Sequence, residues 1–198
     1  MKVDTAFATV PLPGQKESGD LSLVKRVGAG TLVAVVDGLG HGQEAASAAH
    51  AAVGALDRYA REPLSDLVRR AHEALVGLRG VVLGLAYLDP QAATMTWLGV
   101  GNVEGLLLRA PASRGARTQS LLVRGGVVGS HLPPLAAEVV PLRCGDTLIL
   151  ATDGVRSQFL DATPPYLEPQ ALADHVLTRW GTQTDDALVL VVRYVGSA

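Results

Sequence analysis

The sequence predicts an α+β fold in which mainly antiparallel sheets are flanked by helices. Short segments rich in Val, Leu and Thr recur along the chain between Gly, Pro and Asp residues, which is the pattern of strands. Three longer segments have the apolar spacing of helices, and they do not alternate one by one with the strands. Because a doubly wound parallel sheet requires that alternation, we expect packed antiparallel sheets instead.

Nine segments are expected to be strands because each is short, apolar and bounded by residues that favour turns. In chain order they are Lys2–Ala8, Leu21–Arg26, Thr31–Val36, Val81–Leu88, Thr94–Gly99, Gly105–Arg109, Ser120–Arg124, Thr147–Ala151 and Ala187–Tyr194. Two of the expected helices interrupt this series after the third strand, and the third helix precedes the last strand.

The three expected helices differ in the signals that mark them. Gln43–Ala60 is rich in alanine and has glutamate in its first turn. Leu64–Leu78 carries apolar residues along one face, and Ser65 is its expected N-cap. Pro169–Trp180 is followed by glycine, which is a common residue just after a helix.

Length and composition are those of one globular domain spanning residues 1–198. Of the 198 residues, 48% are hydrophobic and 18% are charged, which excludes a disordered chain. No internal repeat or linker divides the sequence. We expect Ala110–Gln119 to be the most mobile loop and Ala162–Pro165 to be a second, stiffer one.

Several classes of function are disfavoured. The longest apolar stretches are far shorter than the roughly 20 residues that a membrane-spanning helix needs. The N-terminus carries Asp4 and no apolar signal region, and the lone Cys144 fits a reducing compartment, so a cytoplasmic location is expected. A formal net charge of −2 and an aromatic content of 4% give no footprint for nucleic acid or an anionic membrane.

Aspartates stand beside expected strands at four separated places. Asp20 precedes LSLVKR, Asp37 follows TLVAVV, Asp153 follows LILAT, and the pair Asp185 and Asp186 precedes ALVLVV. A carboxylate at the end of a buried strand costs several kcal/mol of desolvation unless a cation or hydrogen bonds compensate. The sequence therefore makes these aspartates candidates for one cation-binding site.

Carboxylates brought together in this way form the oxygen-rich ligand set that Mg²⁺ or Mn²⁺ prefers. The single cysteine and five histidines argue against zinc. Two ions that share a carboxylate would clamp a phosphate and acidify a water molecule, which is the two-metal route to in-line hydrolysis. A lone Asp-Gly pair is structural about four times in five, but DGLGHG between a strand and a helix, together with the other three pieces, favours the functional interpretation.

These motifs resemble a known family. TLVAVVDGLGHGQEAASAA, DTLILATDGV and TDDALVLVV, with SGD upstream, are similar to the PPM-type metal-dependent Ser/Thr protein phosphatases, and within them to the bacterial SpoIIE-like branch. The resemblance runs from about Asp4 to Val192, and the compact form is similar to the stressosome feedback phosphatases of that branch. It implies a four-layer α-β-β-α sandwich of two mainly antiparallel sheets, with two Mn²⁺ or Mg²⁺ ions at the sandwich edge.

The resemblance also implies roles for single residues. Asp37 would bridge the two ions, and the carbonyl of Gly38 would bind one of them. Asp153 and Asp185 would hold the other ion. Asp20 would lie on the side of the Gly38-bound ion, directly or through water. Catalysis would then proceed through a metal-activated water held by the aspartates.

Other positions are uncertain. Asp186 falls where the family often has Asn or Asp, and it is assigned to the surroundings of the ligands. The histidine that follows Asp-Gly in larger members of the family is Leu39 here. His41 either takes that role or is a helix-entry residue that bonds a backbone carbonyl, and Asn102 is a further residue that could face the metals.

The expected function is hydrolysis of phosphoserine or phosphothreonine on a signalling partner. By the resemblance, the substrates would be phosphorylated STAS-domain proteins of a stressosome-type stress-response complex, with no nucleic-acid or membrane partner. We expect a monomer. Two alternatives stay open: a phosphatase-like module that binds phosphoproteins without hydrolysing them, and a hydrolase of a small phosphoester.

Overall fold

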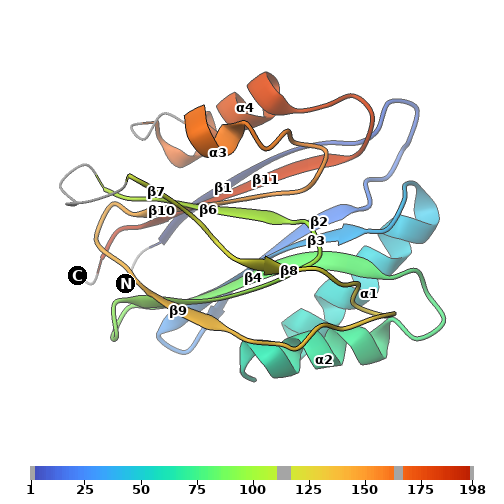
Figure 1. Cartoon of the computed structure of the whole chain (residues 1–198), viewed down its shortest axis with the longest axis horizontal. Helices are drawn as coiled ribbons and strands as arrows, with labels where there is room; N and C mark the ends of the chain where they lie inside the picture. The colour runs from blue at the N-terminus through green and yellow to red at the C-terminus, as the bar shows by residue number, and fades with distance from the viewer. Residues whose placement is uncertain (1–2, 111–116, 163–166, 197–198) are drawn as a thin grey trace.

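The computed structural model describes residues 3–110, 117–162 and 167–196. Two sheets pack face to face, and helices cover the outer face of each, so the chain forms four layers in the order α-β-β-α (Figure 1). The predicted α+β sandwich is thereby confirmed, and all strand pairs are antiparallel except the short β5–β8 pair.

Sheet A has the strand order β1-β11-β10-β6-β7. Its strands are β1 (Val3–Val10), β11 (Ala187–Tyr194), β10 (Thr147–Ala151), β6 (Glu104–Leu108) and β7 (Thr118–Ser120). Sheet B has the order β2-β3-β4-β5-β8, with β9 also paired to β5. Its strands are β2 (Asp20–Val27), β3 (Gly30–Gly38), β4 (Val81–Asp89), β5 (Thr94–Val100), β8 (Val123–Arg124) and β9 (Glu138–Pro141).

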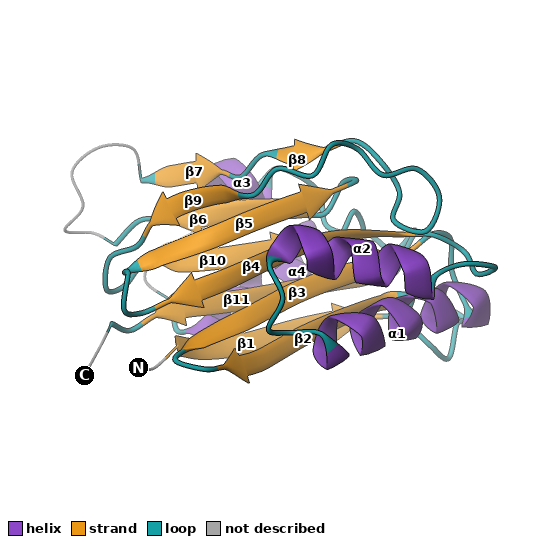
Figure 2. Cartoon of the chain, turned by 90° about the horizontal axis from the view of Figure 1, so that it is seen from below, coloured by secondary structure: helices purple, strands orange, loops and turns teal. Residues whose placement is uncertain are grey.

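Two helices cover each sheet (Figure 2). Helices α1 (Gln43–Arg58) and α2 (Leu64–Ala74) pack against sheet B and against each other. Helix α4 (Pro169–Trp180) packs along β1 and β11 of sheet A, and the short helix α3 (Phe159–Ala162) contacts β7. No helix in the described ranges combines the length and apolar character that crossing a membrane requires.

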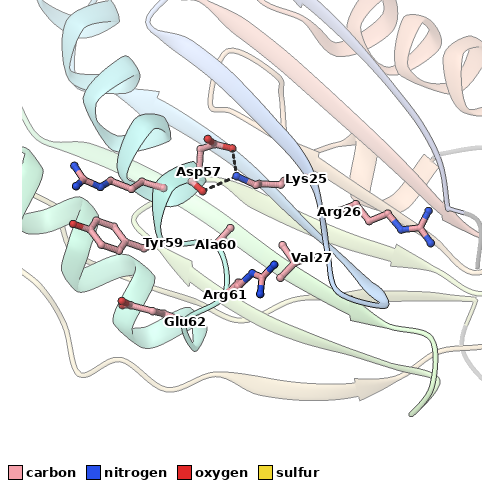
Figure 3. A pocket seen from close by; sticks show the side chains of 9 residues that line it. Lys25, Arg26, Val27, Asp57, Tyr59, Ala60, Arg61 and Glu62 are labelled. Carbon is pink, nitrogen blue, oxygen red and sulfur yellow. Dashed lines mark hydrogen bonds and ion pairs between the residues drawn. The ribbon is translucent and has the colours of Figure 1, made fainter.

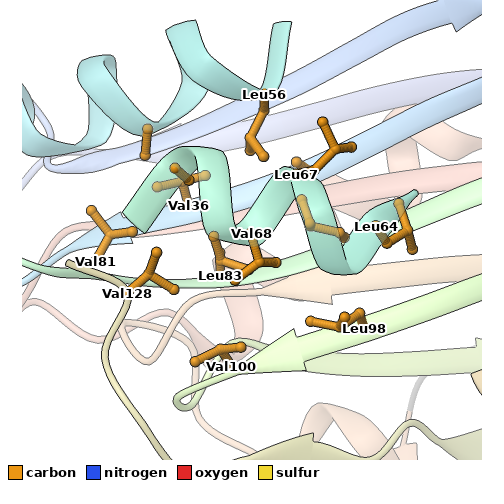
Figure 4. Packing of buried hydrophobic residues seen from close by; sticks show 14 of the residues in the cluster. Val36, Leu56, Leu64, Leu67, Val68, Val81, Leu83, Leu98, Val100 and Val128 are labelled. Atoms are coloured by element: carbon orange, nitrogen blue, oxygen red, sulfur yellow. The ribbon is translucent and has the colours of Figure 1, made fainter. Parts of the chain in front are cut away.

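Three apolar layers hold the sandwich together. The layer between the sheets contains Trp97, whose indole Nε1 donates to the carbonyl of Leu122 at 2.8 Å. The layer under α1 and α2 is aliphatic, and Figure 4 shows part of it, including Leu56, Leu67 and Leu83. The third layer lies between sheet A and α4. Because full burial of one such side chain contributes about 1.5–3 kcal/mol, these layers fix both sheets relative to their helices.

The structure corrects three sequence expectations. Ser120–Arg124 is not one strand, because Ser120 ends β7 in sheet A while β8 lies in sheet B. The second helix ends at Ala74 rather than Leu78, and Gly77 just beyond it has a positive φ of 83°. Ser65 is inside that helix and Pro63 is at the N-cap position, so Ser65 is not the cap.

Two further elements were not expected from the sequence, namely β9 and α3. Of the two expected loops, residues 111–116 and 163–165 lie outside the described residues. Residues 118 and 119 of the first expected loop belong to β7 instead, because they pair with β6.

Candidate functional site

The four aspartate positions meet at one edge of the sandwich because of the strand directions. Asp20 begins β2 and is paired in register with Asp37 near the end of β3. In sheet A, β10 and β11 are antiparallel, so Asp153 after the end of β10 lies close to Asp185 before the start of β11. Residues separated by more than 160 positions in the chain are therefore neighbours in the fold.

A cavity of about 310 Å³ lies at this edge. Three of the predicted ligands, Asp37, Asp153 and Asp185, line it. The other lining residues are small, apolar or neutral, and they are Leu39, Gly40, Val82, Gly101, Asn102, Gly125 and Gly126. Asn102, which the sequence left uncertain, donates from Nδ2 to Asp153 Oδ2 at 2.9 Å and so orients that carboxylate.

Asp20 is buried beside Asp37 and is held by a threonine. Only 4% of Asp20 is exposed, and its Oδ2 accepts a hydrogen bond of 2.7 Å from the Thr152 hydroxyl. The same hydroxyl oxygen accepts the backbone N–H of Leu188 at 2.9 Å. Thr152 thus connects the start of β2 to β11. No sequence signal marked Thr152, although it directly precedes Asp153.

Asp186 has a different task from its neighbours. Its Oδ1 accepts the N–H of Leu12 and its Oδ2 accepts the N–H of Gly19, both at 2.7 Å. Asp186 is buried and is not among the residues that line the cavity. Its carboxylate therefore fastens the β1–β2 connection to the start of β11, next to Asp20.

Close packing around Gly38 explains why glycine follows Asp37. A Cβ atom at Gly38 would collide with the backbone of Ala45 in the first turn of α1. A Cβ atom at Gly19 would lie 2.9 Å from the Ala45 side chain and 3.4 Å from the Gly38 carbonyl oxygen. The Asp-Gly turn, the Ser-Gly-Asp turn and α1 are consequently in direct contact.

His41 belongs to the DGLGHG loop, and Arg79 contacts that loop. His41 is exposed, its Nδ1 is 3.4 Å from Gln15 Nε2, and it is not among the residues that line the cavity. Arg79 Nη1 donates to the carbonyl oxygen of Leu39 at 3.2 Å. The sequence alone gave no signal for Arg79, because its partner is 40 positions away.

Burial and mutual repulsion shift the acidities of these carboxyl groups. The pKa of Asp37 is raised to about 9, first by burial and then by the charges of Asp20, Asp153, Asp185 and Asp186. Burial also raises the pKa of Asp20 to about 7, although its bond from Thr152 works in the opposite direction. The pKa of Asp153 is raised by burial and by Asp185, against the hydrogen bond from Asn102.

Such a concentration of negative charge fits a cation, because a cation removes the repulsion that raises these pKa values. In the described part of the chain, no three Asp, Glu, His or Cys side chains already converge as a closed metal site. Asp37, Asp153 and Asp185 nevertheless line one cavity. The donor set consists of oxygen atoms, which suits Mg²⁺ or Mn²⁺.

A second cavity, of about 400 Å³, lies between the end of β2 and the end of α1 (Figure 3), and it shares no lining residue with the aspartate cavity. There Lys25 Nζ pairs with Asp57 Oδ1 at 2.8 Å. The Glu62 carboxylate, which also lines this cavity, accepts two hydrogen bonds from Arg70. Because both acidic groups have cationic partners, and because the other charged lining residues are arginines, this cavity lacks the uncompensated negative charge of the aspartate cavity.

We expect the stability of the protein without divalent ions to fall as the pH rises. The folded pKa values of Asp37 and Asp20 exceed the value of about 3.9 in an unfolded chain, so the folded state retains protons that the unfolded state releases. Their contribution is complete below about pH 4 and is lost as the pH passes 7 and 9.

Urea unfolding in EDTA at pH 5, 7 and 9 measures this effect, and Mg²⁺ should restore stability at pH 8. The loss between pH 6 and pH 9 should be smaller in Asp37→Asn. A free energy of unfolding that increases from pH 5 to pH 9 in EDTA would contradict the assignment of raised pKa values to these groups.

Comparison with known proteins gives one family match. The sequence model of the family described as Stage II sporulation protein E (SpoIIE) matches residues 28–195. No curated protein sequence matches the chain.

Three of the similar solved structures cover almost the whole chain. One is described as the bacterial stressosome, a modular system that has been adapted to control secondary messenger signalling. Its TM-score is 0.88 at 28% identity, and the match covers 98% of this chain and 100% of that chain. RsbX in complex with magnesium has a TM-score of 0.82 and 19% identity, covering 96% and 94%. The catalytic domain of the Ser/Thr phosphatase PstP with two manganese ions has a TM-score of 0.74 and 18% identity, covering 96% and 97%.

Proposed function

Because the chain belongs to the SpoIIE family of PP2C-type protein phosphatases, we propose that it removes phosphate from serine or threonine of a partner protein with the help of divalent ions. The observation that carries this proposal is the cavity shared by Asp37, Asp153 and Asp185. The three residues lie at the ends of β3, β10 and β11, in two different sheets. Only the complete fold brings them together.

Asp37, Asp153 and Asp185 would hold the ions. Asp20, which is paired in register with Asp37, and the Gly38 carbonyl would complete the set of oxygen ligands. Bound Mg²⁺ or Mn²⁺ ions would neutralise charge on the phosphate and lower the pKa of a water molecule. RsbX in complex with magnesium and PstP with two manganese ions have the same fold and support this choice of ions.

Neighbouring side chains orient the carboxylates of the site through hydrogen bonds. Asn102 holds the Asp153 carboxylate, and Thr152 holds that of Asp20. Two neighbouring glycines, Gly125 and Gly126, form part of the wall and allow a substrate to approach closely. His41 is exposed and is not a lining residue, so we assign it no part in protonating the leaving group.

The partner that we propose is a phosphorylated STAS-domain protein of a cytoplasmic, stressosome-type signalling complex. The support is the likeness to a stressosome structure at 28% identity over the whole of that chain, and to RsbX. A phosphopeptide should then be a better substrate than p-nitrophenyl phosphate, because the open cavity gives access to a protein segment.

The test is release of phosphate from p-nitrophenyl phosphate and from a phosphoserine peptide, each with EDTA, Mg²⁺ or Mn²⁺. We expect turnover only with a divalent ion, and a higher kcat/KM on the peptide. Tight binding of the peptide without release of phosphate would support the binding module instead. Turnover restricted to the small phosphoester would support a small-molecule hydrolase.

A further inference from the structure

The candidate cavity contains acidic groups but no basic side chain. Asp37, Asp153 and Asp185 line it, and no Lys, Arg or His from the described ranges is among its lining residues. Ions bound there would attract the phosphate itself. When the phosphorylated side chain of a substrate enters the cavity, the substrate residues on either side of it would lie at the rim. The charges of the rim would therefore influence which substrate sequences are bound well.

Arg79 contacts one part of the rim. It lies between α2 and β4, and its Nη1 donates to the carbonyl oxygen of Leu39 at 3.2 Å. The same guanidinium packs against Gly40, where an added Cβ would collide with it. Leu39 and Gly40 both line the cavity. Arg79 also pairs with Glu44 in the first turn of α1. Because a guanidinium has five N–H donors, these contacts leave donors for a further anion.

Arg124 occupies a second part of the rim. It ends β8 and directly precedes Gly125 and Gly126, which line the cavity. Its carbonyl oxygen accepts the N–H of Gly101 at 2.8 Å, and Gly101 is a lining residue as well. The side chain of Arg124 is exposed. The backbone at Arg124 is therefore fixed at the cavity while its side chain remains accessible to a substrate.

From this arrangement we propose that Arg79 and Arg124 form a cationic rim that selects phosphosites flanked by acidic residues. The substrate class is a phosphorylated protein segment with Asp or Glu within two positions of the phosphosite. In an extended segment, the Cα atoms of such residues lie within about 7 Å of the Cα atom of the phosphorylated residue. That distance is shorter than the Debye length of roughly 8 Å at physiological salt. This inference rests on the proposed phosphatase function.

The experiment compares three phosphoserine peptides of equal length, with four flanking residues that are all Glu, all Gln or all Lys. For the unmodified protein with Mn²⁺, we expect kcat/KM to be roughly 10-fold higher for the Glu peptide than for the Lys peptide at low salt. The ratio should approach 1 in 0.5 M NaCl. Arg124→Glu should reverse the preference, and Arg79→Gln should reduce it by about 3-fold.

Arg143→Glu is the matched control, because Arg143 is exposed and lies before β10, at the opposite end of that strand from Asp153. This variant should keep the preference for the Glu peptide. Equal turnover of the three peptides, or a preference that survives both rim substitutions, would overturn the inference while leaving the phosphatase function intact. No turnover of any peptide or of p-nitrophenyl phosphate with Mn²⁺ would overturn the phosphatase function, and this selectivity with it.

Discussion

Asp37→Asn is expected to lower phosphatase kcat by about 1,000-fold or more, which corresponds to roughly 4 kcal/mol of transition-state stabilisation. Asp37 lines the cavity with Asp153 and Asp185 and is paired in register with Asp20, so its carboxylate is central to the acidic group. Asparagine has nearly the same shape but lacks the charge that would hold two cations. Steady-state turnover of a phosphopeptide with saturating Mn²⁺ measures the loss.

The same substitution should leave the protein folded and make it more stable without ions. Burial and four neighbouring carboxylates raise the pKa of Asp37 to about 9, which means that its ionised form is strongly disfavoured in the folded state. Removing the ionisable group should raise the free energy of unfolding at pH 8 in EDTA by more than about 1 kcal/mol. Chemical unfolding at that pH gives the value directly.

Asp174→Asn provides the control, because Asp174 is an exposed carboxylate on α4 that does not line the cavity and that accepts a hydrogen bond from Gln170 of the same helix. It should change neither turnover nor stability appreciably. Full turnover of Asp37→Asn at an unchanged Mn²⁺ concentration would show that the cavity is not the catalytic site. Unfolding of Asp37→Asn in EDTA would instead show that the charge of Asp37 stabilises the fold.

Much of the fold follows from local sequence signals. Ala187–Tyr194 and Thr147–Ala151 were predicted with the boundaries that the structure has, because each is a mainly apolar run that becomes almost entirely buried on both faces in sheet A. Pro169–Trp180 was also correct, since proline at its start and glycine after its end mark the limits of a helix.

The failures arise where pairing partners decide the structure. Ser120–Arg124 has the composition of one strand, but its two ends pair with β6 and β5 in different sheets. β9 was not predicted because it ends in proline, which is unfavourable within a sheet. It also does not have a buried apolar face along its whole length, since Val139 within it is 63% exposed. Neither the sequence of Ser120–Arg124 nor that of β9 indicates which strand will pair with it in the folded protein.

In the candidate site too, residues marked by local sequence could be predicted, and residues whose roles depend on distant partners could not. The aspartates could be found because a charge beside a buried strand is unusual at every one of the four places. Thr152 and Arg79 could not be found, because their roles depend on partners 132 and 40 positions away. In the structure, Asn102 lies beside Asp153, although the turn that contains Asn102 resembles an ordinary connection between two strands.

Asp186→Ala is expected to destabilise the protein by about 3 kcal/mol. The variant removes one buried and one partly buried hydrogen bond, both of 2.7 Å, and leaves the N–H groups of Gly19 and Leu12 without their acceptor. Hydrogen bonds to a charged group contribute about 1.5–3 kcal/mol each, and relief of the repulsion from Asp20 and Asp37 offsets part of the loss. Urea unfolding at pH 7 in EDTA measures the difference.

Asp186→Asn separates this structural role from a purely electrostatic one. The amide oxygen of asparagine accepts only one of the two N–H groups, while its NH₂ group faces the other as a second donor. We therefore expect a loss between zero and that of Asp186→Ala, whereas Asp37→Asn gains stability under the same conditions. If both Asp186 variants are as stable as the unmodified protein, the carboxylate of Asp186 does not fasten the β1–β2 connection to the site. Asp186 would then belong with the acidic residues that only repel one another until a cation binds.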